Sequence, residues 1–336
     1  MRRQQTLDGK ELSESPKPPK PYILSELEQC LPLVEEQGYK KTKIPKTRGK
    51  WRELCVPSPD LKKTQRRILK LLTRNTNVPR WSTVFGLYKR GYPHIEHARI
   101  HSNSRFILTL DVENAFSSIT WSKIEPILYE IILLDMTSRM TNRLCQIILK
   151  LTTHEKTLPQ GAPTSPFLFY IFLSKKMEYV HGAIWRQLKK IKASECKISI
   201  YVDNIVISTK NKRITPEAIS GIIHSIESVG LPINRQKTRL YDCRQGAAIV
   251  TGLSIDGKGN IAIPKTKREI IRTMLNNSCY IPYNPKLDEK IDGTISYVRY
   301  IYGNEIPNRI KKPYDKYREH RNLQKLALEK DTHGPL

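Results

Sequence analysis

Residues 197–208 read KISIYVDNIVIS. Apolar residues at alternate positions lead up to Val202, and the apolar run 205–207 follows Asp203 and Asn204. Two β-rich runs on either side of an Asp-Asn pair predict a hairpin whose tight turn carries one carboxylate. Asp-Asn is also ordinary turn chemistry, so the hairpin alone does not distinguish a catalytic element from a plain connection.

A second strand that ends on a carboxylate is expected upstream, where residues 106–111 read FILTLD and end at Asp111. Two strand-borne Asp residues that converge at one end of a sheet could bind divalent cations. Mg²⁺ prefers hard oxygen ligands and keeps positions for water and substrate phosphates, which suits phosphoryl transfer with two metal ions. Between the two strands lies LPQGAPTSP (158–166), a turn rich in Gly and Pro.

The order of these motifs resembles the palm of reverse transcriptases. The first Asp stands in LDVENAF, LPQGAPTSP follows, and YVDN comes last, where the family usually has Tyr-x-Asp-Asp. The resemblance covers about residues 45 to 320 and implies an α+β, right-hand polymerase fold with fingers, an antiparallel palm sheet and a helical thumb. The expected parts are an N-terminal arm and short helix (1–40), fingers (41–105), palm (106–260, with fingers-side helices at about 121–152), thumb (261–322) and C-terminal tail (323–336).

Charge is the strongest feature of the composition. The chain has 336 residues and a net charge of +26. This favours a polyanionic partner, because each Lys or Arg that neutralises a phosphate releases counterions. A basic face also suits an acidic membrane surface, but no apolar run approaches the roughly 20 residues of a spanning helix. The N-terminal MRRQQ has no apolar segment behind it, and six Cys are scattered along the chain. We therefore expect a cytoplasmic protein without signal peptide, disulfide framework or membrane partner.

The resemblance assigns the chemistry of the expected active site. Two Mg²⁺ ions would be held by Asp111, the backbone carbonyl of Val112 and Asp203, with Asn204 in the place of the usual second Asp. Lys237 follows the hairpin where the family has a basic residue, which makes it a candidate for protonating the departing pyrophosphate. A solvated lysine is the alternative.

The resemblance also assigns contacts to the incoming nucleotide. Arg52 stands where the family has a basic residue that grips the triphosphate, and Lys50 is the second choice. Phe116, five residues after the first Asp, would lie under the sugar and clash with a ribose 2′-OH, favouring dNTPs; a core Phe is the alternative. Gln160 would lie against the nascent base pair, and Tyr201 of the YVDN motif completes this set.

Two further segments resemble signatures of retron reverse transcriptases. The segment 95–101 reads IEHARIH and resembles Asn-Ala-x-x-His, with His97 in place of Asn and His101 in place of the final His. Two His at this spacing also suit zinc, but Ala98 follows the first His and no third ligand is evident. A structural role for both His residues, through hydrogen bonds, is as compatible with the pattern as contact with RNA. The expected strand 249–255 contains the second signature, Val250, Thr251 and Gly252.

The C-terminal region combines an apolar helical stripe with many cations. Ile291, Ile295, Val298 and Tyr302 recur at helical spacing. We interpret the region as a thumb that holds nucleic acid through phosphates, with these cations as its candidates: Arg299, Arg309, Lys311, Lys312, Lys316 and Arg318.

Together these patterns predict an RNA-directed DNA polymerase, a nucleotidyltransferase, similar to retron and other bacterial defence-associated reverse transcriptases. The resemblance implies a partner non-coding RNA as template and primer, dNTPs, a DNA product linked to that RNA, and a separate effector protein in antiviral defence. Asn204 removes one negative charge from the metal site. It is compatible with an active natural variant, an inactive one or an engineered residue. The alternative function is therefore a catalytically impaired RNA-binding scaffold of the same fold.

Overall fold

The computed structural model describes residues 22–36, 38–45, 51–75, 78, 83–86, 94–132, 136–282 and 284–332. Lys50 lies outside these described residues. The chain divides into two compact units. The first unit comprises residues 1–89, 111–189 and 216–236, and the second comprises 90–110, 190–215 and 237–336. Among the described helices, none combines the length and apolar character needed to cross a membrane.

The first unit consists mainly of helices around one antiparallel strand pair. Proline occupies the first position of several of its helices, where its fixed φ favours the helix and its missing N–H costs no hydrogen bond. The described elements are α1 (Tyr22–Glu28), α2 (Pro32–Glu36), β1 (Tyr39–Pro45), β2 (Trp51–Pro57), α3 (Pro59–Asn75), β3 (Val84–Phe85), α5 (Trp121–Ile131), α6 (Ser138–Thr152), α7 (Ser165–Lys190), α8 (Pro216–Glu227) and the 3₁₀ turn η2 (Arg235–Lys237).

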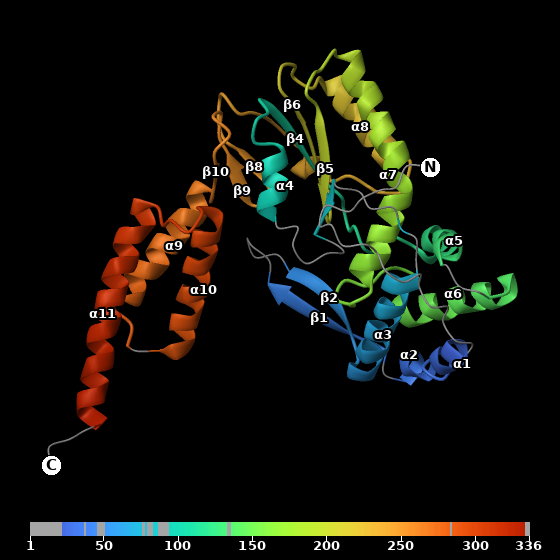
Figure 1. Ribbon diagram of the computed structural model, residues 1–336, viewed down its shortest axis with the longest axis horizontal. Helices are drawn as coiled ribbons and strands as arrows, with labels where there is room; N and C mark the ends of the chain where they lie inside the picture. Colours follow the sequence, from blue (N-terminus) through green and yellow to red (C-terminus); the bar gives the residue numbers. More distant parts are fainter. Residues whose placement is uncertain are drawn as a thin grey trace, which may run out of the picture. The chain divides into compact units, whose positions relative to one another are not determined.

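The second unit contains two antiparallel sheet segments and a bundle of three helices (Figure 1). Four strands lie in the order β5-β6-β4-β7, and a smaller sheet has the order β10-β9-β8. The elements are α4 (His94–Ile100), β4 (Phe106–Asp111), β5 (Lys197–Tyr201), β6 (Asn204–Thr209), β7 (Arg239–Asp242), β8 (Ala248–Val250), β9 (Leu253–Ile255), β10 (Ile261–Ala262), α9 (Lys265–Ser278), α10 (Pro285–Ile301) and α11 (Asn308–Thr332).

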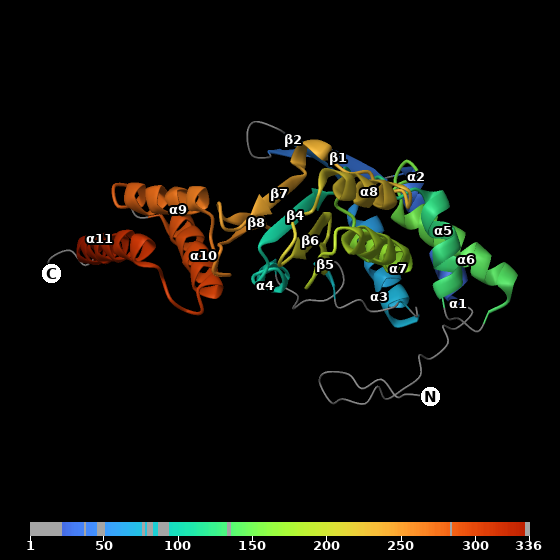
Figure 2. The ribbon, with the colours of Figure 1, turned by 90° about the horizontal axis from the view of Figure 1, so that it is seen from above.

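One continuous apolar core joins the elements of the second unit. It includes Ile107 of β4, Val250 of β8, Ile271 of α9 and Ile310 of α11. The predicted stripe on α10 is largely confirmed, since Ile291, Ile295 and Val298 are buried, and Ile301 joins them while Tyr302 is half-buried. Figures 1 and 2 show α9, α10 and α11 side by side. Buried residues of these helices and of β8 and β9 belong to the same core, so the helical bundle and the small sheet pack together.

The predicted hairpin over residues 197–208 is confirmed, but its turn lies one residue earlier than expected. Tyr201 pairs with Asn204, so the two-residue turn is Val202-Asp203. Val202 has φ +54°. A β-branched residue is strained in this left-handed region, at a cost of about 1–3 kcal/mol that surrounding contacts must offset. The turn that carries Asp203 therefore contains backbone strain.

The expectation of one strand over residues 249–255 is wrong, because β8 and β9 form a second tight hairpin. Thr251 and Gly252 make its turn, with φ +46° and +79°. Positive φ at both central positions is the geometry of a turn that matches the twist of a two-stranded ribbon, and Gly252 adopts it freely. The threonine does not, and its side chain is held by the contacts described below.

Candidate active site

The two predicted carboxylates stand at strand ends. Asp111 is the last residue of β4, Asp203 directly precedes β6, and both side chains are half-buried. The Asn204 Nδ2 donates a hydrogen bond to Asp203 Oδ1 at 2.7 Å. The neutral amide thus orients one oxygen of the Asp203 carboxylate, which an aspartate at position 204 could not do.

The backbone beyond Asp111 is fixed by a segment far away in the sequence. The N–H of Asn234 donates to the Asp111 carbonyl at 2.8 Å, and the N–H of Glu113 donates to the Pro232 carbonyl at 2.7 Å. Val112, whose side chain is buried, lies between these bonds. The main chain that would present the Val112 carbonyl is therefore held in one conformation.

A pocket of about 320 Å³ in the second unit borders the YVDN hairpin. The antiparallel register places Tyr201, Asn204 and Val206 on one face of β5 and β6. Thr109 of β4 and the tip of the β8–β9 hairpin complete the wall, which consists of Thr109, Tyr201, Asn204, Val206, Ile249, Thr251 and Gly252. The structure thus brings YVDN and Val-Thr-Gly, which are about fifty residues apart in the sequence, to one cavity.

Helix α4 holds the strained tip of the β8–β9 hairpin. The Thr251 hydroxyl donates to the His94 carbonyl at 3.2 Å, and His97 Nδ1 lies 3.5 Å from the Thr251 hydroxyl oxygen. The His97 ring also packs 5.6 Å, between centroids, from the ring of Tyr201. The two segments that resemble retron signatures are therefore in direct contact, a relation that sequence analysis did not predict.

His101 connects both strands of the YVDN hairpin. Its Nδ1 lies 2.7 Å from the Ser208 hydroxyl on β6, and its Nε2 lies 2.6 Å from the Ser199 hydroxyl on β5. Ser104 donates to Ser208 at 2.9 Å. His97 and His101 are both fully buried. Their rings are thus not exposed to a nucleic acid in this structure, and no group of three His, Cys, Asp or Glu gathers in the described part of the chain.

Burial makes these histidines sensitive to acid. It lowers the pKa of His97 to about 4, and it lowers the pKa of His101 well below 6.5. A depressed folded-state pKa stabilises the fold above pH 6.5, and this contribution is lost as pH falls through the folded value. For His97 alone, the decrease of the pKa from 6.5 to about 4 corresponds to about 3 kcal/mol of unfolding free energy.

We therefore expect the free energy of unfolding to decrease by about 3 kcal/mol or more between pH 6.5 and pH 4. The measurement is urea unfolding at a series of pH values. His97→Phe should flatten the profile, while substitution of His224, an exposed residue of α8, should not. If the dependence of the unfolding free energy on pH is the same in His97→Phe and in the wild type, protonation of His97 is not the cause of the acid sensitivity.

In the first unit, the LPQGAP turn packs against strand β2. The Cys55 N–H donates to the Gln160 carbonyl at 2.8 Å. Gly161 has φ +125°, and a Cβ there would lie only 3.0 Å from the Cys55 carbonyl oxygen, so this close approach requires glycine. Arg52 is exposed three residues before Cys55, opposite Ile44 of β1. The structure therefore places the strand of Arg52 beside the turn of Gln160.

The remaining predicted residues lie at exposed or partly exposed positions. Phe116 is half-buried, and its ring packs 5.5 Å, between centroids, from Phe169 of α7. Lys237 is exposed at the end of η2. The six cations predicted for the thumb are all exposed: Arg299, Arg309, Lys311, Lys312, Lys316 and Arg318. On α11 they alternate with buried Ile310, Tyr314 and Tyr317, so the helix presents a basic face.

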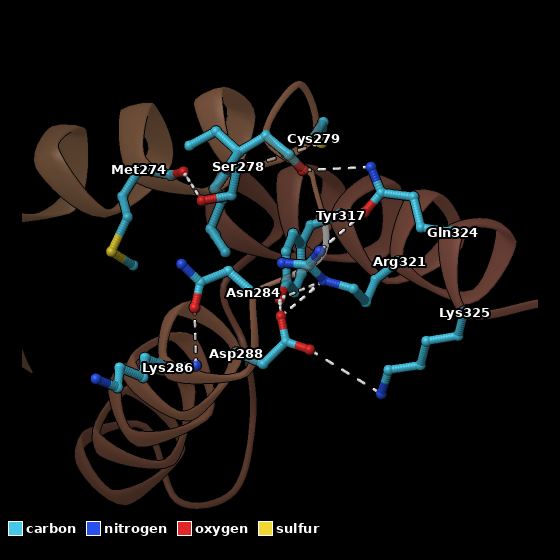
Figure 3. A network of polar contacts seen from close by, with 12 residues as sticks. Met274, Ser278, Cys279, Asn284, Lys286, Asp288, Tyr317, Arg321, Gln324 and Lys325 are labelled. Carbon is cyan, nitrogen blue, oxygen red and sulfur yellow. Dashed lines mark hydrogen bonds and ion pairs between the residues drawn. The ribbon is translucent and has the colours of Figure 1, made fainter. Parts of the chain in front are cut away.

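A buried ion pair that the sequence did not predict lies inside the helical bundle (Figure 3). Arg321 Nε on α11 lies 2.7 Å from Asp288 Oδ1 on α10, and the Tyr317 hydroxyl donates to the same carboxylate. Burial, aided by this hydrogen bond to Asp288, raises the pKa of Tyr317 to about 12. The spacing of Tyr317 and Arg321 on one helical face is the only sequence signal for this network.

Comparison with known proteins identifies the family. Residues 44–268 match the model of the family described as reverse transcriptase (RNA-dependent DNA polymerase). The retron Ec83 reverse transcriptase of Escherichia coli is 24% identical over 247 residues, 70% of this chain and 74% of that protein. The retron Ec86 reverse transcriptase of the same organism is 27% identical over 246 residues, 73% of this chain and 68% of that protein.

A solved structure of telomerase from Candida albicans with a TWJ fragment of telomeric RNA aligns with a TM-score of 0.46 and 12% identity, over 84% of this chain and 55% of that chain. The chain thus spans about half the length of this telomerase. The family match covers more than half of the chain and includes Asp111, the LPQGAP turn and the YVDN hairpin. The chain therefore belongs to the reverse transcriptase family, is an RNA-directed DNA polymerase and has a right-hand polymerase fold with an antiparallel palm sheet.

Proposed function

We propose that this polymerase copies a partner non-coding RNA into DNA in a retron or a related anti-phage defence system. The observation that carries the proposal is the pocket in which the YVDN hairpin meets Thr251 and Gly252, with His97 behind it. The similar proteins named as retron reverse transcriptases support the same context. The other partners that we propose for this chain are dNTPs, the DNA product and a separate effector protein. The proposed location of the chain is the cytoplasm.

Divalent metal dependence is general in this family, and the donors present here fit Mg²⁺. The proposed ligands of two Mg²⁺ ions are the Asp111 and Asp203 carboxylates and the Val112 carbonyl, with the Asn204 amide at the edge. All are hard oxygen donors. Thr109, two residues before Asp111, lines the same pocket as Asn204, which supports convergence of the two strand ends. When bound, the ions would activate the primer hydroxyl and stabilise the leaving pyrophosphate.

The protein's own residues orient the nucleotide in this proposal. Arg52, or Lys50 in its place, binds the triphosphate, and Gln160 and Tyr201 border the nascent base pair. The approach of Cys55 to Gly161 brings Arg52 and Gln160 to one region of the first unit. Lys237 donates a proton to pyrophosphate as it leaves.

Phe116→Ala is expected to increase incorporation of ribonucleotides relative to deoxyribonucleotides by roughly tenfold or more, the scale of a steric difference in a tight pocket. A half-buried ring packed on Phe169 cannot move away from a 2′-OH, whereas a methyl group leaves room. Single-nucleotide extension with dNTP and rNTP measures the ratio. Phe116→Tyr, which keeps the ring, is the control. Equal discrimination by all three proteins would make Phe116 an ordinary core residue.

Nucleic acid is held by the exposed thumb cations on α10 and α11 through phosphates. Such contacts carry no sequence information. Selectivity for the partner RNA comes from the β8–β9 tip formed by Thr251 and Gly252, because contacts with α4 fix its shape. Val250, which is buried in the core, supports this tip and does not reach the RNA.

The direct test is co-expression of the chain with the non-coding RNA encoded beside its gene, followed by isolation of the nucleic acid that copurifies. We expect Mg²⁺-dependent DNA that is complementary to the RNA and joined to it. RNA that copurifies without any DNA, together with no extension of a supplied primer, would favour the scaffold alternative. Copurification of random cellular RNA in place of the co-expressed RNA would contradict the assignment of a specific partner RNA.

A further inference from the structure

We propose that the polar face of α6 and the end of α1 form an auxiliary groove that binds the RNA backbone. None of its residues belongs to the nucleotide, metal or thumb sites described above. The inference rests on the proposed function only in that the polymerase holds RNA.

The groove is a cleft of about 520 Å³ in the first unit. α1 packs on α6, and the two helices lie side by side in Figures 1 and 2. Six of the groove residues recur three, four or seven positions apart along α6 and so share one face. The full wall is Glu28, Leu31, Arg139, Asn142, Arg143, Gln146, Ile147 and Lys150.

The charge of the groove is positive. Its single carboxylate, Glu28, forms an ion pair with Arg143. The neighbouring Glu26 pairs with Arg67 of α3 at 3.2 Å and does not neutralise the groove. Within the described part of the chain, Arg139 and Lys150 have no carboxylate partner, and both are exposed. Two cations are therefore available for a ligand with negative charge.

The spacing suits a chain of phosphates better than a small anion. Arg139 and Lys150 are eleven residues apart, about 16 Å along the helix axis. A nucleic-acid strand has one phosphate per about 3.4 Å of axis rise in a B-form duplex, so several phosphates fit between the two cations. Asn142 and Gln146, which lie between them, can hydrogen-bond to phosphate and 2′-OH groups. Ile147 and Leu31 give an apolar floor on which a ribose can lie.

The test is binding of a 30-nucleotide oligo(rU) to the full chain across salt concentrations. The double variant Arg139→Gln/Lys150→Gln should reduce the slope of log affinity against log salt by about 1.4 units, or about 0.7 for each phosphate of a single strand that the variant no longer neutralises. The affinity ratio of wild type to variant should then shrink about sevenfold between 50 and 200 mM salt. The matched control is Lys189→Gln/Lys190→Gln, which removes the same charge from exposed positions at the end of α7.

Two results would overturn the proposal. One is a slope that changes equally in both double variants, which would show only the loss of overall charge. The other is loss of binding to a poly-glutamate peptide without loss of RNA binding, which would make the groove a peptide site. Extension of a short DNA primer on an RNA template at low salt is measured in parallel. Absence of that activity in the wild type would contradict the polymerase assignment while leaving the groove result readable.

Discussion

Asp203→Asn is expected to lower Mg²⁺-dependent primer extension by about three orders of magnitude or more, which corresponds to about 4 kcal/mol of transition-state stabilisation. Asp203 is the only carboxylate of the YVDN turn, because Asn204 is neutral. The hydrogen bond from Asn204 orients the Asp203 carboxylate, and the strained Val202 is the other residue of the same turn. Single-turnover extension of a DNA primer on an RNA template measures the effect.

Asn204→Asp provides the matched comparison. It restores a second carboxylate and removes the amide that donates to Asp203, so Mg²⁺ should half-saturate at a lower concentration. If Asp203→Asn retains more than about a tenth of wild-type activity, Asp203 is a turn residue and the proposed metal site is wrong. An inactive wild type with an active Asn204→Asp would support the impaired scaffold.

The second large effect is expected in helices α10 and α11, where Asp288→Asn should lower the free energy of unfolding by about 3 kcal/mol. Only 5% of the Arg321 side chain is exposed, and its Nε lies 2.7 Å from Asp288. Removal of the carboxylate leaves a buried guanidinium without its countercharge. The Tyr317 hydroxyl exchanges a charged acceptor for a neutral amide at the same time (Figure 3). Thermal and urea unfolding measure the change.

Two controls separate this network from ordinary surface charge. Lys325 Nζ lies 4.0 Å from the same carboxylate but is half exposed, so Lys325→Gln should cost less than about 1 kcal/mol. The double variant Asp288→Asn/Arg321→Met removes both charges and should be more stable than Asp288→Asn alone. Equal stability of the wild type and Asp288→Asn would show that the pair contributes nothing.

Local patterns predicted the hairpin, strand β4 and the apolar stripe of α10, because each depends on neighbouring residues and their periodicity. The sequence did not reveal what depends on long-range contacts. Ser199 and Ser208 appeared as ordinary polar strand positions, yet His101 contacts both from about a hundred residues away. Thr251 adopts a conformation that threonine disfavours, and its contacts with the His94 carbonyl and the His97 ring account for it. The roles of Asp111, Asp203 and the nucleotide-binding residues remain proposals from the family resemblance.

The contacts of His101 have a practical consequence for purification. They are hydrogen bonds between a neutral imidazole and hydroxyl groups in a fully buried position, and salt screens exposed charges far more than buried neutral contacts. Binding of nucleic acid through exposed cations, in contrast, weakens steeply with ionic strength. A wash in molar sodium chloride should therefore strip copurifying RNA from the enzyme while the YVDN hairpin keeps its geometry, yielding a nucleic-acid-free preparation ready for reconstitution with a chosen template.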